Sequence, residues 1–184
     1  MASNNPSAFP KPRRHGKKSA TSKVRDKRLL SAQNKAKRGV DAYVKLVRKA
    51  TPLELVELER QGVQGSFIKD LSARMGVPAS RIFETLGVPK ATLERKALEG
   101  KPVTGSGGHA AIAMAKLLGT AEEILANSTA DEARDFDVAK WLGQWIERPQ
   151  PSLGGLAPAD LLDTPTGFEI VARLLRAIES GSYQ

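Results

Sequence analysis

Several polar side chains between residues 90 and 101 have the chemistry to bind a polyanion. The cationic ones can neutralise phosphates, and an arginine guanidinium can also donate two parallel hydrogen bonds to the edge of a guanine. We expect this set to bind DNA, with its first two members nearest the bases because they begin their helix. The residues are Lys90, Thr92, Arg95, Lys96 and Lys101.

The segment 79–101 has the layout of a helix-turn-helix motif, which would position these side chains. Gly87 permits the tight turn between the two helices, because glycine accepts a positive φ without steric cost. In this motif the second helix enters the major groove of DNA, and its first residues reach the base edges. The apolar residues expected to pack the motif onto the core are Ile82, Phe83, Leu86, Val88, Leu93 and Ala97.

A second register of the motif begins earlier in the chain. Met75-Gly76-Val77-Pro78 resembles Leu86-Gly87-Val88-Pro89, so residues 67–75 and 79–86 could form the two helices instead. The reading helix of that register would expose Arg81 as its only cation, beside Glu84. We favour the later register because it alone brings several cations to the groove.

The sequence offers no convincing set of residues for catalysis, for a metal or for a cofactor. It has no cysteine, and His15 and His109 lie apart from any carboxylate cluster with metal-ligand spacing. The stretch Gly105-Ser106-Gly107-Gly108 lacks the preceding strand and the Gly-Lys-Ser/Thr of a phosphate-binding loop. No nucleophile–base pair stands out, and Trp141 and Trp145 are expected in the core. We therefore predict a protein that is not an enzyme and that uses no metal or cofactor.

Charge is distributed unevenly along the 184-residue chain. Residues 1–39 contain twelve basic residues and one acidic residue, Asp26. This segment has almost no large apolar side chain before Leu29, so we predict a disordered basic tail that strengthens binding to nucleic acid. Residues 121–184 contain eleven acidic and five basic residues, which suits a partner other than DNA. No apolar stretch approaches the length of a membrane span, so we predict a cytoplasmic protein that joins the nucleoid when bound to DNA.

Apolar periodicity predicts an all-α fold of two small domains behind the tail. Residues 40–126 would form a helical dimerisation and helix-turn-helix domain, and residues 127–184 a small C-terminal domain. Thr51 and Pro52 would begin one helix, and Ser66 would cap another. On the first of these, Leu53, Val56 and Leu58 would face inward. Further helices are predicted over residues 67–75, 79–86, 89–99, 110–125, 135–147 and from 165 to a stop at Gly181.

The predicted helix over residues 110–125 differs from the others. Its residues are apolar nearly all round, because alanine, isoleucine, methionine and leucine dominate it. A surface helix would have a polar face. We therefore expect this helix at the centre of the core or at a contact between two copies of the chain.

The C-terminal third carries a more specific pattern. A turn reading Leu153-Gly154-Gly155-Leu156-Ala157-Pro158 precedes Asp160-Leu161-Leu162, and a final helix with Val171, Leu174-Leu175 and Ile178-Glu179 leads to Gly181. Together with Trp141-Leu142 and with residues 86–95, this pattern resembles the Xre/MbcA/ParS-type antitoxins over about residues 63–184. Leu156 stands where that family often has a basic residue.

The resemblance implies a type II antitoxin of a toxin–antitoxin system. Such an antitoxin is helical and dimeric, represses its own operon through the helix-turn-helix, and covers the active site of a RES-domain toxin that consumes NAD or uses it to modify a target. The partners implied are thus the RES-domain toxin, promoter DNA and a second copy of the chain, with no membrane. The residues assigned to the toxin contact are Leu153, Gly154, Gly155, Pro158, Glu179, Gly181, Ser182 and Tyr183.

Two interpretations from other classes remain open at this point. A stand-alone helix-turn-helix transcriptional regulator could have kept the C-terminal domain for another partner or for dimerisation. A nucleoid-binding protein could depend mainly on the basic tail.

Overall fold

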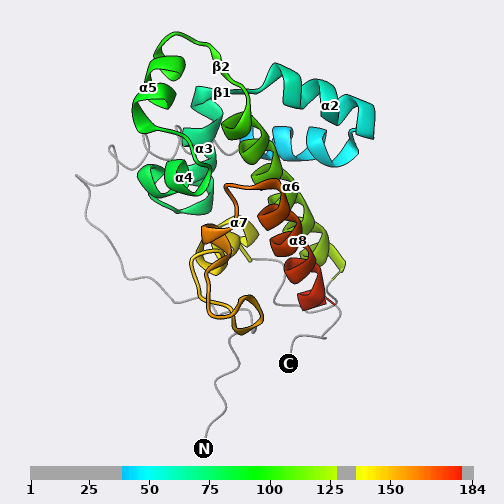
Figure 1. The fold of residues 1–184 in the computed structure, drawn as a ribbon. Helices are drawn as coiled ribbons and strands as arrows, with labels where there is room; N and C mark the ends of the chain where they lie inside the picture. The colour runs from blue at the N-terminus through cyan, green and yellow to red at the C-terminus, as the bar shows by residue number, and fades with distance from the viewer. Residues whose placement is uncertain (1–38, 128–135, 180–184) are drawn as a thin grey trace, which may run out of the picture.

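The structure, a computed structural model, describes residues 39–127 and 136–179 (Figure 1). The predicted tail, residues 1–39, lies outside these ranges except for Gly39, and so do the predicted toxin contacts Gly181, Ser182 and Tyr183. The described residues are mostly helical, as the sequence predicts. They also include two strands of two residues each, β1 (Val63–Gln64) and β2 (Pro102–Val103), which pair antiparallel with Val63 opposite Val103.

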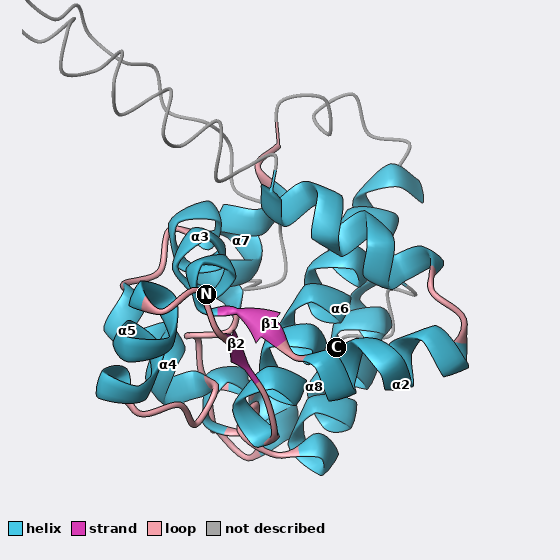
Figure 2. Ribbon diagram, turned by 90° about the horizontal axis from the view of Figure 1, so that it is seen from above, coloured by secondary structure: helices cyan, strands magenta, loops and turns pink. Residues whose placement is uncertain are grey.

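The helices follow the order that the turn and capping residues predict. A helix over residues 39–49 comes first, and Figure 2 shows the small sheet lying between the α3–α5 group and α6. Several helices begin or end a few residues from their predicted limits; α3, for instance, begins before Ser66, with Gln64 as its N-cap. The remaining helices are α2 (Pro52–Gln61), α3 (Gly65–Met75), α4 (Ala79–Thr85), α5 (Lys90–Leu98), α6 (Ser106–Asn127), α7 (Val138–Trp145), the short η2 (Pro151–Leu153) and η3 (Pro158–Asp160), and α8 (Pro165–Glu179).

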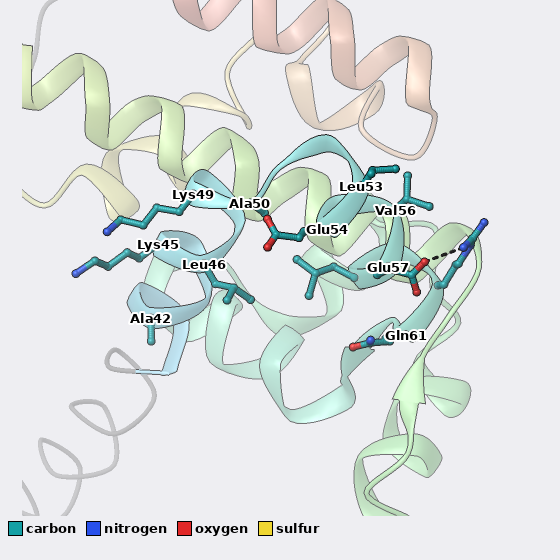
Figure 3. Close-up of a pocket in the computed structure, with 12 residues that line it drawn as sticks. Ala42, Lys45, Leu46, Lys49, Ala50, Leu53, Glu54, Val56, Glu57 and Gln61 are labelled. Atoms are coloured by element: carbon teal, nitrogen blue, oxygen red, sulfur yellow. Dashed lines mark hydrogen bonds and ion pairs between the residues drawn. The ribbon is translucent and has the colours of Figure 1, made fainter.

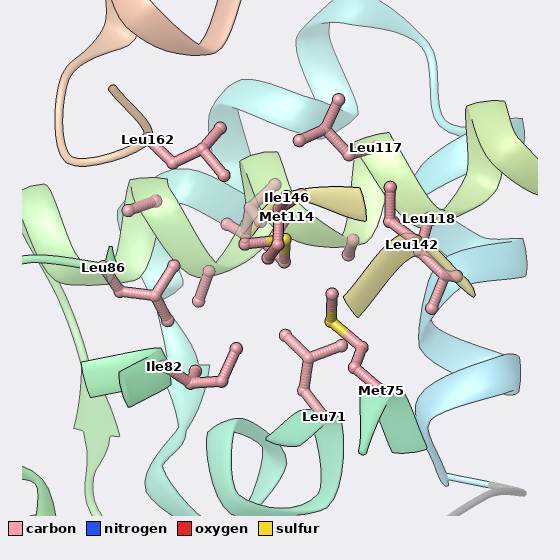
Figure 4. Close-up of a cluster of buried hydrophobic side chains, with 14 of the residues drawn as sticks. Leu71, Met75, Ile82, Leu86, Met114, Leu117, Leu118, Leu142, Ile146 and Leu162 are labelled. Atoms are coloured by element: carbon pink, nitrogen blue, oxygen red, sulfur yellow. The ribbon is translucent and has the colours of Figure 1, made fainter. Parts of the chain in front are cut away.

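Helix α6 is the centre of the core. It is longer than predicted, and its residues are buried on almost every side by α7, α8, α2 and the small sheet of the same chain. The sequence predicts this helix either in the core or at a contact between two copies, and the structure shows it in the core of a single chain. Figure 4 shows its core side chains Met114, Leu117 and Leu118 among those of other elements, which include Leu71, Met75, Ile82, Leu86, Leu142, Ile146 and Leu162.

The predicted inward face of α2 is wrong for two of its three residues. The helix begins as expected, with a capping box in which the Thr51 N–H donates to Glu54 Oε2 at 2.6 Å. Leu53 is nevertheless 80% exposed and Val56 41% exposed, whereas Leu55 and Leu58 pack against the core. The physical reason is the choice of docking face, since α2 meets α6 through these two leucines and through an ion pair between Glu59 and Lys116 at 3.4 Å.

The buried apolar residues form one hydrophobic cluster, whose members range along the chain from Val40 to Leu175. Helix α7 packs on both α3 and α6, and α8 packs on α6. At the start of α7, the Arg74 guanidinium of α3 pairs with Asp137 and with Asp41 of the first helix. Partial burial opposes ionisation of Asp137, but the hydrogen bond and charge of Arg74 outweigh it and lower the pKa of that carboxyl.

The α3–α7 contact is closest at Gly143, which gives a direct test of the packing. A Cβ added there would lie 2.2 Å from the Met75 carbonyl oxygen. We expect Gly143→Ala to lower the free energy of unfolding by about 1–3 kcal/mol through overpacking. At an uncrowded helix position, Gly→Ala would instead raise the free energy of unfolding by up to ~1 kcal/mol. The sign of the change therefore shows whether the contact at Gly143 is close. Urea unfolding measures it, with Gln144→Ala on the exposed side of the same helix as control. Equal or greater stability of Gly143→Ala would contradict the close contact.

Candidate functional site

Helices α4 and α5 are joined by a tight turn, in the place where the sequence predicts a helix-turn-helix. Gly87 adopts φ 62°, and the Val88 N–H donates to the Phe83 carbonyl at 2.8 Å, so the chain reverses within a few residues. Val88 is buried in the turn, and Leu93 fixes α5 to the core with none of its surface exposed. The close approach of Gly65 to Ala97 packs the start of α3 against the end of α5. The residues predicted to pack this unit onto the core are therefore buried, except Ala97, which is half-buried.

Helix α5 and the turn that follows it present three cations to solvent. The side chains of Lys90, Arg95 and Lys101 are 69%, 63% and 67% exposed. Each has an acidic neighbour: Glu94 lies 3.9 Å from Lys90, and Glu99 lies 3.6 Å from Arg95 and 3.1 Å from Lys101. Exposed pairs of this kind contribute little, so these cations can exchange the carboxylates for phosphates at small cost.

The other two residues of the predicted DNA-binding set are less accessible. Thr92 is half-buried on α5. Lys96 is also half-buried, and its ammonium donates a hydrogen bond of 2.7 Å to the Pro102 carbonyl. Lys96 therefore holds β2 against α5, a role that its charge alone did not reveal.

Arg81, the cation of the alternative register, contacts the C-terminal part of the chain. Its Nε donates to Glu147 at 2.9 Å, and its Nη2 lies 3.4 Å from Asp160 Oδ1. The hydrogen bond to Glu147 is the main reason that the pKa of Arg81 is raised above its usual value. Because Arg81 is paired with Glu147 and with Asp160 of η3, it is less available to a partner than the exposed cations of α5.

The turn that follows α7 is organised by Gln150. This residue is 6% exposed, and its carbonyl accepts hydrogen bonds from the N–H groups of Leu153 and Gly155, both at 3.0 Å. Its own N–H donates to the Leu156 carbonyl at 3.0 Å. Sequence reasoning missed Gln150, although one signal was present: it stands between two prolines, which have no N–H to donate.

The residues predicted to contact a toxin play different parts in this turn. Gly154 and Gly155 adopt φ values of 67° and 87°, which favour glycine, and they lie exposed with open space around each Cα. Pro158 is buried and Leu153 is half-buried against the core, so these two residues anchor the turn to the core. Beside the glycines, Leu156 is 50% exposed. The accessible surface of the turn therefore includes the two glycines and Leu156, together with Pro151 and Ser152.

Asp160 ties this turn to α4. One carboxylate oxygen accepts the Ala157 N–H at 3.1 Å, and the other pairs with Arg81 of α4. Nearby, the Ala159 N–H donates to the Ile146 carbonyl at the end of α7. The turn and α4 are thus held in a fixed relation.

The turn and the end of α8 lie at one end of the molecule, and α5 lies at the other (Figure 1). Glu179 is the last residue of α8, whose first turn is capped by the Thr164 hydroxyl accepting the Gly167 N–H at 3.1 Å. The structure therefore brings the predicted toxin contacts within its range to one end and separates them from the predicted DNA contacts.

In residues 39–127 and 136–179, no group of three or more histidines, aspartates or glutamates could hold a metal ion. Within the same ranges, no helix has both the length and the apolar character needed to cross a membrane.

Comparison with known proteins gives two matches. Residues 132–181 match the family described as the antitoxin Xre/MbcA/ParS C-terminal toxin-binding domain. A relative from Sphingobium sp. (strain YBL2), named Prs ADP-ribosylating antitoxin, is 34% identical over 142 residues, which cover 77% of this chain and 87% of the relative. Because the second match is much longer than the first, the similarity also includes residues upstream of position 132.

Substituting Arg95 and substituting Arg81 should have different effects on DNA binding. We expect Arg95→Ala to weaken binding to the operator by about 1–3 kcal/mol, with a smaller loss on unrelated DNA, if its guanidinium reads a base. Arg81→Ala should lower the melting temperature, because it removes the link to Glu147 and Asp160, and should change operator affinity less than Arg95→Ala. Fluorescence anisotropy with labelled operator measures both affinities. A larger loss of affinity for Arg81→Ala would favour the earlier register.

Proposed function

This chain belongs to the Xre/MbcA/ParS family of antitoxins and is the antitoxin of a toxin–antitoxin system with a C-terminal toxin-binding domain, and we propose that it silences its toxin with the turn around Gly154 and the end of α8 while repressing its own operon through α5. The toxin-binding match over residues 132–181 is the observation that carries the proposal. We propose that the chain acts in the cytoplasm and by binding alone, without catalysis or cofactor.

The shape of the C-terminal turn supports the toxin side of this proposal. The hydrogen bonds to Gln150 fix the turn before any partner arrives, so binding would require little ordering. Leu156, half exposed beside two glycines, offers an apolar side chain that can enter a cleft of the partner. A few such anchors usually dominate the energy of a protein interface. Glu179 and the predicted contacts Gly181, Ser182 and Tyr183 would extend the same surface.

We assign the toxin to the RES-domain class, which transfers or consumes the ADP-ribose part of NAD. The name of the Sphingobium relative joins an antitoxin to ADP-ribosylation of Prs. We therefore propose that the toxin partnered by this chain transfers ADP-ribose to a protein. The acidic C-terminal segment would then contact a protein surface rather than DNA.

The DNA side of the proposal depends on three exposed cations, Lys90 and Arg95 on α5 and Lys101 in the turn after it. A reading helix places its first residues at base edges, which assigns that place to Lys90 and Thr92, with Arg95 one turn further on. Two copies of the chain would place two such helices in successive major grooves, as repressors of this motif do. Because the turn lies at the opposite end of the molecule, the same chain could hold its toxin and its operator together.

Substituting aspartate for an exposed leucine tests the toxin contact. We expect Leu156→Asp to weaken the complex with the protein encoded beside this gene at least tenfold, because a charge would enter an apolar contact. Leu98→Asp, on an 89% exposed leucine at the end of α5, is the matched control and should leave toxin affinity unchanged. Co-expression followed by titration calorimetry measures both. Equal loss in the two variants, or loss only for Leu98→Asp, would place the toxin on α5 and contradict the proposal.

Removing residues 1–38 tests the part of the basic tail. We expect the shortened chain to bind all DNA sequences more weakly, because the tail carries twelve basic residues that can neutralise phosphates. Each cation lost from the interface should reduce the slope of log K against log salt by about 0.9. Anisotropy titrations on operator and unrelated DNA at several salt concentrations measure the slope. An unchanged slope would show that the tail does not contact the DNA phosphates.

A further inference from the structure

The two ends of the turn around Gly154 meet at one side chain that lies outside the turn, the guanidinium of Arg81 on α4. Before the turn, both carboxylate oxygens of Glu147 accept from Arg81 Nε, at 2.9 and 3.1 Å. After the turn, Asp160 Oδ1 lies 3.4 Å from Arg81 Nη2. Residues 148–159 therefore form a loop whose ends are joined by a single planar donor from another helix.

The exposed part of this loop contains little that could hold its shape. Gly154 and Gly155 have no side chain to pack, and nothing lies within 4 Å of the place where a Cβ would be. Glycine also gains more backbone freedom than any other residue when a segment loosens. The bonds that define the loop therefore lie at its base, where the Gln150 carbonyl accepts two N–H groups and Asp160 accepts the Ala157 N–H at 3.1 Å.

Arg81 is well placed to support that base. It precedes two buried residues of α4, Ile82 and Phe83, which fix the helix to the core. Glu84 lies 3.6 Å from its Nη1, so three carboxylates surround one guanidinium. The side chain is 35% exposed, and a single pair at such a site contributes little to the free energy of unfolding. A planar guanidinium shared among carboxylates, however, also fixes their relative orientation.

We propose that Arg81 is a positioning residue for toxin binding, which holds the two ends of the loop in the geometry that the toxin meets and does not itself touch the toxin. This role rests on the proposed function, because it takes the turn around Gly154 as the toxin contact. Arg81 lies outside the family's toxin-binding segment, which begins at residue 132. That segment therefore owes part of its affinity to α4, in the part of the chain that we propose binds DNA.

The loss of this link would act on the free chain. A loop that samples several shapes must be ordered when the toxin binds, and the cost of ordering lowers the affinity. In the complex the toxin itself would hold the loop, so the bound loop would be the same with or without the guanidinium. A positioning residue is therefore recognised by a change in the free loop and in the affinity, while the bound loop stays unchanged.

Three variants test the link. Arg81→Ala removes both of its ends, Asp160→Asn removes one end and keeps an oxygen for the Ala157 N–H, and Arg81→Lys keeps the charge but loses the planar fork. We expect the affinity for the protein encoded beside this gene to fall about fivefold for Arg81→Ala and less for the other two. Arg81→Ala combined with Asp160→Asn should lose no more than Arg81→Ala alone, because both changes break the same link. Titration calorimetry measures all four affinities.

Arg60→Ala is the matched control. Its guanidinium also pairs with a surface glutamate, Glu57 at 2.8 Å (Figure 3), but on α2, away from the turn (Figure 1). We expect this variant to bind the toxin as the wild type does. Circular dichroism melting verifies the fold of every variant, and the titrations are made below the lowest melting temperature. Hydrogen–deuterium exchange should show the Gly155 and Ala157 amides of Arg81→Ala exchanging faster than those of the wild type in the free chain and equally in the complex.

Wild-type affinity in Arg81→Ala, losses that add in the double variant, an equal loss in Arg60→Ala, or unchanged exchange in the free chain would each overturn the proposal. Leu156→Asp in the same series separates it from the proposed function. If Leu156→Asp weakens the complex and Arg81→Ala does not, the positioning role alone fails. If Leu156→Asp leaves the affinity unchanged, the turn is not the toxin contact, and the proposed function fails together with the positioning role.

Discussion

The burial of α6 is the constraint on which the rest of the structure depends. Its apolar residues leave it no face suited to water, so neighbouring elements must cover it on almost every side. Glycines on this helix allow the closest approaches: a Cβ at Gly108 would lie 2.5 Å from the Val103 carbonyl, and one at Gly119 would lie 2.6 Å from the Arg48 stem. The small sheet, α7, α8 and the two N-terminal helices are therefore placed by one shared partner.

A single frame of this kind allows one chain to present several surfaces. Helix α5 and the C-terminal turn are each connected to α6 or to the helices packed on it, and they lie at opposite ends of the molecule (Figure 1). Arg74 of α3 and Arg81 of α4 add polar links to Asp137, Glu147 and Asp160. An antitoxin that must hold a protein while bound to DNA would benefit from surfaces that are fixed relative to one another and do not overlap.

The features that the sequence predicted correctly are those specified by neighbours in the chain. Thr51 and Pro52 begin a helix because a hydroxyl cap and a proline act within one turn, and Gly87 makes its turn through its own φ. The all-α fold follows from periodicity, and the family follows from the spacing between residues 153 and 181. None of these needs a distant contact.

The features that sequence reasoning missed depend on distant partners. Leu53 and Val56 were placed inside because apolar periodicity does not specify which face of a short helix docks on its neighbour. Lys96 and Arg81 look alike as surface cations, yet one binds the Pro102 carbonyl and the other binds two carboxylates some 66 and 79 residues away. Strands of two residues carry no periodic signal, so β1 and β2 could not be predicted at all.

The most direct test of the account is hydrogen–deuterium exchange on the chain alone, with the co-purified toxin, and with operator DNA. The toxin should protect amides of residues 150–160 and of the last turn of α8, and the DNA should protect amides around the start of α5. Each ligand should leave the other's region unchanged. Toxin protection centred on α5, or no protection of residues 150–160 in a stable complex, would contradict the claim that one fixed frame carries two separate binding surfaces.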